Sequence, residues 1–340
     1  MPMWKEIALR PSLPRHAARL AAAFGTFALA ALAHAADAPK PGERLERRGD
    51  EIVVCGQLFH TGTPVVLWTD PGGYDAYRVE PRFIPADKAR PELPKVRFGQ
   101  RKHNMTEADL ARVQLKGWDL PTLQNVVDQF VVHYDVAGTS KRCFHVLQDD
   151  RGLSVHFMLD LDGTIYQTLD LKEAAWHATI ANGRSVGIEI ANMGAYTPGR
   201  SSARDKWYEK GPDGKVKIKL PGTPQDDLIR NPDALLAPAR NEPITGQIRG
   251  HTLEQYDLTQ AQYDALTKLS AALCTVFPKL KCDYPRDAEG KLRLDTLSRP
   301  EFDAYQGILG HWHVQTNKTD PGPAFQWDAV IDGARELMKK

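Results

Sequence analysis

The sequence has few cysteines and no excess of charge of either sign. Four cysteines are spread over 340 residues, and none has the Cys-x-x-Cys spacing of thiolate zinc sites or redox motifs. The 44 basic and 43 acidic residues almost cancel, which indicates no partner such as a nucleic acid or an anionic membrane surface. With 42% hydrophobic residues, the composition is that of a globular protein of one large or two small domains.

A long apolar run is also missing. The apolar run from Leu20 to Ala33 is shorter than the roughly 20 residues that a membrane-spanning helix needs. Basic residues precede this run and Ala33-His34-Ala35 closes it, a pattern typical of a cleavable secretory signal. The sequence therefore predicts a signal peptide at residues 1–35, a periplasmic or secreted protein, and no membrane span after signal removal. A membrane anchor is the alternative interpretation.

Export would permit disulfide bonds among the four cysteines. Cys274 and Cys282 are close in sequence, which favours a bridge between them and, by remainder, one between Cys55 and Cys143. A zinc site built from cysteines is the alternative, but its usual ligand spacing is lacking.

The chain divides into segments of different character. Residues 36–100 are rich in proline, contain short strand-like pieces, and are interpreted as an N-terminal extension without visible chemistry. From residue 101 onward strand and helix signals mix, which predicts an α/β domain around one sheet over 101–340. Residues 197–250 are rich in Pro, Gly, Lys and Asp, and are interpreted as an insertion with little structure of its own beside a substrate groove.

Local signals place several elements of this domain. Asp162-Gly163 lies between two apolar runs and predicts a tight hairpin turn. Thr106 begins one predicted helix, and Thr259 with Gln262 forms a capping box at the start of a second. Val186 to Ile190 is a further strand candidate.

His133 follows the strand candidate Phe130-Val131-Val132. A histidine at the end of a buried strand lies where a sheet opens to a site. For an isolated histidine, however, a core position with satisfied nitrogens is the more frequent alternative.

A second cluster of polar residues runs from Gly310-His311-Trp312-His313 to Asp320-Pro321. Pro321 disfavours helix at Asp320 and predicts an extended backbone there. Two imidazoles and one carboxylate, with a fourth position left for water, are the ligands of a hydrolytic zinc ion. A turn-forming aspartate is the alternative for Asp320. If this segment is a strand, His311 and His313 share a face, so His313 is an alternative ligand.

Four motifs occur in an order that resembles a known family. These are Phe130–His133, Ala175-Trp176-His177-Ala178, Gly187-Ile188-Glu189-Ile190 and Lys318–Phe325. The chain resembles the zinc-dependent N-acetylmuramoyl-L-alanine amidases of type 2, which share their fold with peptidoglycan recognition proteins. The resemblance implies a single mixed central β-sheet flanked by helices, and a Zn²⁺ cofactor.

The resemblance also implies roles for individual residues. His133, His311 and Asp320 would bind the metal, with His313 as the alternative to His311. Glu189 would be the general base, and Lys318 would stabilise the oxyanion. The residues expected to contact the substrate are His177, Trp176 and Tyr134. For Glu189 the alternative is a solvent-facing strand residue, and for Tyr134 it is packing.

The implied reaction is hydrolysis of the amide between the lactyl group of N-acetylmuramic acid and L-alanine in peptidoglycan or muropeptides. One alternative is a module that binds peptidoglycan without cleaving it, and such modules lack a complete set of metal ligands. A zinc peptidase that acts on the stem peptide is the other alternative.

Overall fold

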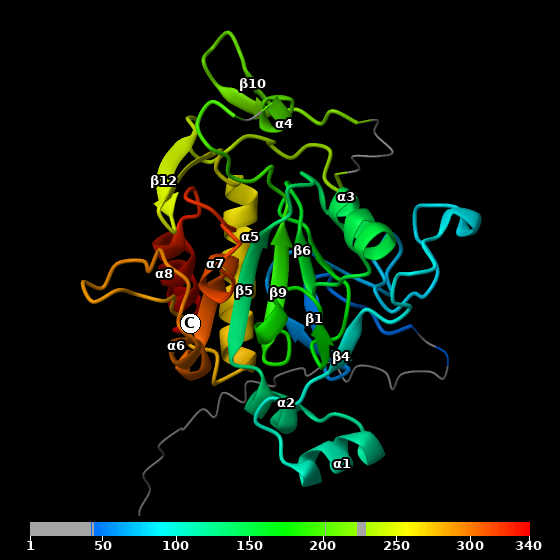
Figure 1. Cartoon of the computed structure of the whole chain (residues 1–340). Helices are drawn as coiled ribbons and strands as arrows, with labels where there is room; N and C mark the ends of the chain where they lie inside the picture. Colours follow the sequence, from blue (N-terminus) through cyan, green and yellow to red (C-terminus); the bar gives the residue numbers. More distant parts are fainter. Residues whose placement is uncertain (1–41, 43, 201, 223–228) are drawn as a thin grey trace, which may run out of the picture. The chain divides into compact units, whose positions relative to one another are not determined.

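A six-stranded mixed β-sheet lies at the centre of this computed structural model (Figure 1). The structure describes residues 42, 44–200, 202–222 and 229–340, so the expected signal peptide lies outside the described residues. The chain divides into the units Met1–Glu46 and Arg47–Lys340, and the central sheet belongs to the second.

The order of strands in the sheet is β14-β5-β9-β6-β7-β3. Strands β14, β5, β9 and β6 run parallel, whereas β7 runs antiparallel to β6 and β3 lies parallel to β7. The bounds of the six strands are β3 (Val65–Leu67), β5 (Gln129–Tyr134), β6 (Phe157–Leu159), β7 (Ile165–Gln167), β9 (Ser185–Ile190) and β14 (Gly307–Gly310). The expected single mixed sheet is confirmed.

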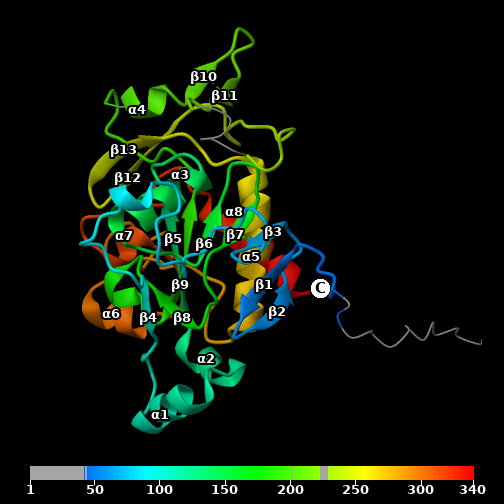
Figure 2. The ribbon, with the colours of Figure 1, turned by 90° about the vertical axis from the view of Figure 1, so that its right-hand side faces the viewer.

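Helices cover both faces of this sheet. Figures 1 and 2 together show α5 and α8 on one face and α3, α6 and α7 on the other. The helices are α1 (Glu107–Lys116), α2 (Leu120–Val126), α3 (Ser140–His145), α4 (Ser202–Asp205), α5 (Gln260–Val276), α6 (Arg299–Ala304), α7 (His311–Val314), α8 (Trp327–Met338), the 3₁₀ helices η1 (Ala86–Lys88) and η3 (Thr179–Ala181), and the π-helix η2 (Val146–Arg151).

The alternation of side chains along the strands separates the core from the site. Phe130 and Val132 of β5, with Ile188 and Ile190 of β9, pack against α5 in the main core. Intervening residues of both strands therefore point to the opposite face. On that face the carboxyl ends of three neighbouring parallel strands come together.

The N-terminal extension is part of this domain. Its strand β3 forms one edge of the central sheet, and β1 (Glu51–Val54) pairs with β2 (Gln57–His60) beside the same core. Strand β4 (Phe98–Gln100) pairs with β8 (Glu173–Ala175). The Asp149 carboxylate of η2 accepts hydrogen bonds from the backbone N–H groups of Arg82 and Phe83. The proline-rich stretch therefore supports η2.

The insertion 197–250 has more structure than the sequence predicts. It contains α4 and the hairpin of β10 (Tyr208–Lys210) and β11 (Val216–Ile218), and it ends in β12 (Ile244–Ile248), which pairs with β13 (His251–Gln255). The expectation of little structure was wrong because strands of three residues are too short to show periodicity. Tyr208 of β10 and Ile218 of β11 pack instead with Trp207 in a cluster that also contains Leu161, Ala191 and Met193 from outside the insertion.

All four cysteines are free thiols, so neither expected disulfide is present. The pairing of Cys55 with Cys143 was wrong, because these residues belong to clusters on opposite faces of the sheet. The thiols of Cys274 and Cys282 lie in hydrogen-bonding contact.

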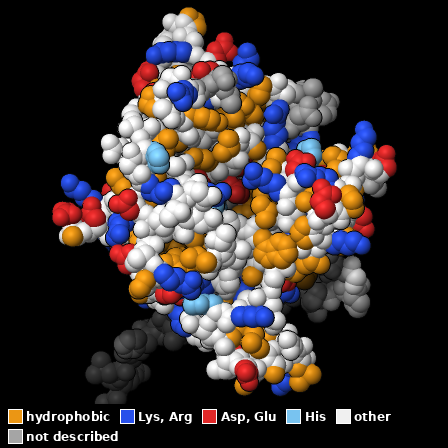
Figure 3. Space-filling view, viewed as in Figure 1, with side chains coloured by type: hydrophobic (Ala, Val, Ile, Leu, Met, Phe, Trp, Pro, Cys, Tyr) orange, Lys and Arg blue, Asp and Glu red, His pale blue; other side chains and the backbone are white. Residues whose placement is uncertain are grey.

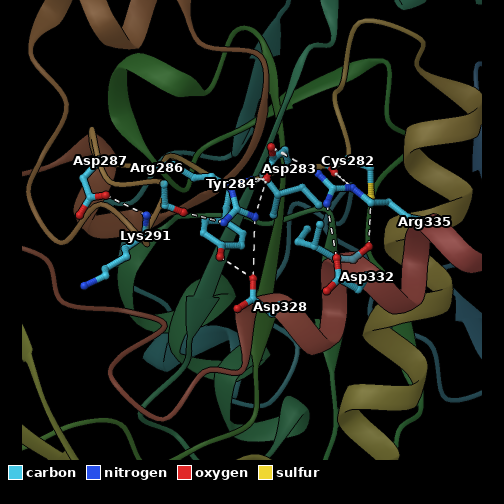
Figure 4. A network of polar contacts seen from close by, with 12 residues as sticks. Cys282, Asp283, Tyr284, Arg286, Asp287, Lys291, Asp328, Asp332 and Arg335 are labelled. Carbon is cyan, nitrogen blue, oxygen red and sulfur yellow. Dashed lines mark hydrogen bonds and ion pairs between the residues drawn. The ribbon is translucent and has the colours of Figure 1, made fainter.

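A polar network fixes the loop that follows α5 (Figure 4). Arg335 of α8 donates to the Cys282 carbonyl at 2.9 Å and forms an ion pair with Asp283 at 3.3 Å. The Asp283 carbonyl in turn accepts a hydrogen bond from Ile308 N of β14 at 2.8 Å. The network thus supports the strand that leads directly to His311.

In the described part of the chain, no helix combines the length and hydrophobicity that would allow it to span a membrane.

Candidate metal centre

Three neighbouring strands bring the polar residues of the site together. His133 and Glu189 are register partners on β5 and β9, and His311 follows the last residue of β14. Ligands collect at the carboxyl ends of parallel strands because these ends meet at one edge of the sheet. The arrangement therefore explains how residues far apart in sequence form one site.

His133, His311 and Asp320 form a buried cluster. The Oδ2 atom of Asp320 lies 2.9 Å from Nδ1 of His133 and 2.9 Å from Nδ1 of His311. The two Nδ1 atoms lie 2.9 Å apart. Among the described residues these three are one of two groups whose donor atoms all lie within 4.8 Å of one another.

The electrostatics of this cluster favour a cation. Burial, reinforced by the charge of His311, lowers the pKa of His133 to about 4. Burial alone would raise the pKa of Asp320, but His311 and His133 outweigh it and lower that pKa. Two imidazoles and one carboxylate are a donor set that suits a divalent zinc ion. The residues therefore fit the metal that the sequence implies.

The structure excludes His313 from the cluster. Residues 311–314 form α7, not a strand, so His311 and His313 point in different directions. Nδ1 of His313 accepts from Gly310 N at 2.9 Å, and Nε2 lies 2.7 Å from the Arg293 carbonyl. Both nitrogens of His313 are thus engaged away from the site.

The segment that contains Asp320 is held by hydrogen bonds from β13. Asp320 lies in a turn, and its bond to Pro321 is cis. Gln255 of β13 donates to the Pro321 carbonyl at 3.0 Å and accepts from Ala324 N at 3.0 Å. A Cβ on Gly322 would lie 2.2 Å from Oε1 of Gln255, so the close approach requires glycine. Sequence analysis missed Gln255.

Glu189 and Lys318 line one cavity together with the three residues of the buried cluster. The Oε2 atom of Glu189 is buried and has no hydrogen-bond partner among the described residues. Burial, with the charges of Asp320 and Asp135, raises the pKa of Glu189, while Lys318 opposes this shift. A carboxylate with an unused buried oxygen next to a candidate metal site can accept a proton from a water molecule.

The cavity has a volume of about 560 Å³. It opens in the hollow at the middle of the face shown in Figure 3, where acidic and basic side chains lie together. The expected residues that line it are His133, Tyr134, Trp176, His177, Glu189, His311, Lys318 and Asp320. No described residue of 197–250 lines the cavity, so the described part of the insertion does not form its wall.

The expected substrate-binding residues differ in how far contacts within the protein engage their side chains. Trp176 is half-buried at the cavity. The Tyr134 hydroxyl is engaged with Oγ1 of Thr319 at 2.7 Å. His177 contacts His133 of the buried cluster, because its Nδ1 lies 3.0 Å from Nε2 of His133. Burial, then the charges of His133 and His156, lower the pKa of His177.

The cavity also contains residues that sequence analysis missed. Arg151, at the end of η2, is exposed at its rim, and Asp135 and Ser154 line it as well. Asp135 follows His133 by two residues, which was a usable signal. Nothing in the sequence around Arg151 distinguishes it from other surface arginines.

Residues 123–323 match the protein family described as N-acetylmuramoyl-L-alanine amidase. The matched segment is more than half of the chain and includes every residue of the metal cluster. The chain belongs to this family. The amidase is thus a hydrolase whose class acts on peptidoglycan.

Solved structures of similar fold are distant in sequence. One is AmiD from E. coli in complex with anhydro-N-acetylmuramic acid-L-Ala-D-gamma-Glu-L-Lys (17% identity, 69% of this chain, 65% of that chain, TM-score 0.32). Another is a selenomethionine derivative of AmpD (17% identity, 69% of this chain, 93% of that chain, TM-score 0.30). A third is the Staphylococcus aureus hydrolase AmiA with its ligand (12% identity, 71% of this chain, 95% of that chain, TM-score 0.35). No curated protein matches the sequence.

Proposed function

We propose that this amidase depends on zinc, which His133, His311 and Asp320 hold. The observation that carries the proposal is the mutual 2.9 Å spacing of two Nδ1 atoms and one Oδ2 atom in a buried position. Zinc, when bound, lowers the pKa of a water ligand to about 7 and polarises a carbonyl oxygen. A fourth coordination position would open to the cavity that the substrate enters.

Glu189 acts as the proton carrier of the reaction. Glu189 lines the same cavity as the three ligands, its Oε2 has no hydrogen-bond partner among the described residues, and its carboxylate accepts the proton of the attacking water. Its raised pKa lets the protonated carboxyl persist long enough to transfer that proton to the leaving amine. The same side chain thereby acts first as a base and then as an acid.

Lys318 stabilises the negative charge that develops on the carbonyl oxygen. Its side chain lines the cavity two residues before the ligand Asp320. A positioned donor of this kind lowers the barrier by roughly 3 kcal/mol. Trp176 provides an apolar surface beside the reacting bond.

The bond cleaved joins the lactyl group of N-acetylmuramic acid to the L-alanine of the stem peptide. The protein acts outside the cytoplasm, and residues 1–35 are removed on export. This location is supported by the basic start, apolar run and Ala-x-Ala exit of the N-terminus. Mass spectrometry of protein secreted by expressing cells tests it, with a mature chain beginning after Ala35 as the expected result.

Digestion of defined muropeptides tests the activity and its zinc dependence together. Purified amidase is incubated with muropeptides, with and without a chelator, and fragments are identified by mass. Intact stem peptides should appear, stop on chelation, and return when Zn²⁺ is added. Shortened stems would instead identify a peptidase, and binding without products would identify a recognition module.

The ligand set is tested with two histidine variants. His311→Ala should lose bound zinc and activity, because it removes one of three donors. His313→Ala should keep stoichiometric zinc in its folded fraction, because both nitrogens of His313 bond elsewhere. Zinc retained by the first variant and lost by the second would reverse the assignment.

A further inference from the structure

Both histidines of the metal cluster present the same nitrogen to it. Nδ1 of His133 and Nδ1 of His311 converge on Asp320, so Nε2 of each ring points away. A neutral imidazole has one protonated nitrogen, and only the unprotonated one can bind a metal. Each ring must therefore keep its single proton on Nε2 for the site to work.

The Nε2 atom of His311 faces a hydrogen-bond acceptor. It lies 2.6 Å from Oε1 of Gln315, the C-cap residue that directly follows α7. Gln315 is four residues after His311, so one helical turn places the amide beside the ring. A carbonyl oxygen at this position accepts the Nε2 proton and leaves Nδ1 free.

The Nε2 atom of His133 faces His177. Nδ1 of His177 lies 3.0 Å away, and Nε2 of His177 lies 3.2 Å from Oγ of Ser185. If Ser185 accepts the His177 proton, Nδ1 of His177 has a lone pair for His133. In the chain of hydrogen bonds from His133 through His177 to Ser185, each bond then has one donor and one acceptor.

Strand β9 is shaped to hold His177 in this position. Ser185, Gly187 and Glu189 alternate along one face of the strand. A Cβ on Gly187 would lie 2.5 Å from Nδ1 of His177, so any larger residue would displace the ring. The backbone of His177 is fixed as well, because the Asn182 side chain accepts from the N–H groups of His177 and Ala178.

We propose that His177, held by Ser185, and Gln315 are positioning residues that fix both ligand imidazoles with the proton on Nε2. The inference rests on the proposed metal site and deepens it. His177 then acts through His133 and does not serve mainly as a substrate contact. Such outer partners of metal-bound histidines typically contribute 10–100-fold to metal affinity.

Zinc affinity of the purified full-length amidase, measured by competition with a chromophoric chelator, tests the proposal. His177→Phe keeps a ring of similar size but lacks an acceptor, and it should weaken zinc binding by roughly 10–100-fold. His177→Asn places an amide oxygen near the former Nδ1 position and should recover most of that loss. Gln315→Leu should weaken binding and Gln315→Glu should restore it. His251→Phe, at an exposed histidine of β13, is the matched control and should leave affinity unchanged.

A second measurement follows the proton itself. In ¹⁵N-histidine NMR spectra of the zinc-loaded protein, His133 should carry a slowly exchanging proton on Nε2. That proton should exchange faster in His177→Phe and return to slow exchange in His177→Asn. Thermal melting shows whether each variant is folded, so that faster exchange of this proton can be told apart from loss of folding. Only folded protein contributes the sharp signal in the spectrum.

The outcomes separate the two proposals. If the wild-type protein binds no zinc, the proposed function fails. If the wild-type protein binds zinc, and the variants His177→Phe and Gln315→Leu each bind zinc as tightly as the wild type, only the positioning role is overturned. An unchanged zinc affinity with a raised KM for His177→Phe would assign that histidine to substrate contact instead.

Discussion

At the scale of single residues, Glu189 has the sharpest predicted effect. Glu189→Gln keeps the shape of the side chain but removes its capacity to accept and return a proton. We expect kcat to fall by about 10²–10⁴ while zinc stoichiometry stays unchanged. Metal content and turnover of the same preparation provide the measurement.

A matched glutamate controls for a general effect of this change. Glu173→Gln alters a half-buried glutamate that contacts Tyr77 and does not line the cavity. It should retain nearly full turnover. Normal activity of Glu189→Gln would remove the proton carrier from the mechanism.

Asp160 predicts a pH dependence of stability. Its side chain is buried and accepts hydrogen bonds from Leu161 N and Ser140 N, while its Oδ2 has no partner among the described residues. Burial raises the pKa of Asp160 to about 8 from its ordinary value of 3.8. The folded state therefore binds one more proton than the unfolded state between these two values.

The sign of the effect follows from that extra proton. The contribution of neutral Asp160 is fully present below pH 3.8 and is lost as pH rises to about 8. The slope is at most about 1.4 kcal/mol per pH unit. Asp160→Asn cannot ionise, so its stability relative to wild type should increase from pH 5 to 8 in denaturant unfolding. A difference that is constant over this range would contradict the raised pKa.

Several residues that meet at the candidate metal centre could be predicted from the sequence. His133, Glu189 and Asp320 lie in short motifs, and the order of these motifs can be recognised even where long insertions separate them. His313 stayed an alternative to His311, because four residues give no clear helical period and a strand would have placed both histidines on one face. Gln255 and Gln315 carry no motif, since their function depends only on which atom each one faces.

At the scale of elements, the hairpin of β12 and β13 is predicted to hold the metal-bearing tail. Gln255→Leu has similar size but leaves the Pro321 carbonyl and Ala324 N–H buried without partners. Each such group costs about 1–3 kcal/mol. We expect a lower melting temperature and weaker zinc binding, because the turn that carries Asp320 loosens.

Gln255→Glu distinguishes the two hydrogen bonds. It keeps an acceptor for Ala324 N and loses the donor to Pro321, so its zinc affinity should lie between wild type and Gln255→Leu. Equal zinc affinity in all three proteins would show that the tail is positioned without this hairpin.

The elements also differ in how far the sequence predicted them. The capping box of Thr259 and Gln262 starts α5 as expected, and Asp162-Gly163 connects β6 to β7. These features are local, so the sequence contains their causes. The pairing of β3 with β7 joins residues about 100 positions apart, and no property of three short apolar residues specifies such a partner.

At the scale of the whole molecule, the N-terminal extension is predicted to be indispensable from Arg47 onward. Ile52, Val54, Val65 and Leu67 lie in the main core. Removal of β3 would also leave the backbone of β7 as an unpaired edge, which promotes aggregation. A domain of 101–340 alone would thus lack part of its core and one strand.

Two truncated proteins test where the folding unit begins. A chain that starts at Arg47 should unfold cooperatively, with the melting temperature and zinc affinity of the longer protein, because Arg47–Lys340 forms one unit. A chain that starts at residue 101 should bind a hydrophobic dye and show no cooperative transition in circular dichroism. Cooperative unfolding of the shorter chain would show that the sheet closes without β3. In that case the extension would act only as a support for η2 and Arg151 at the cavity, and its removal would change KM instead of stability.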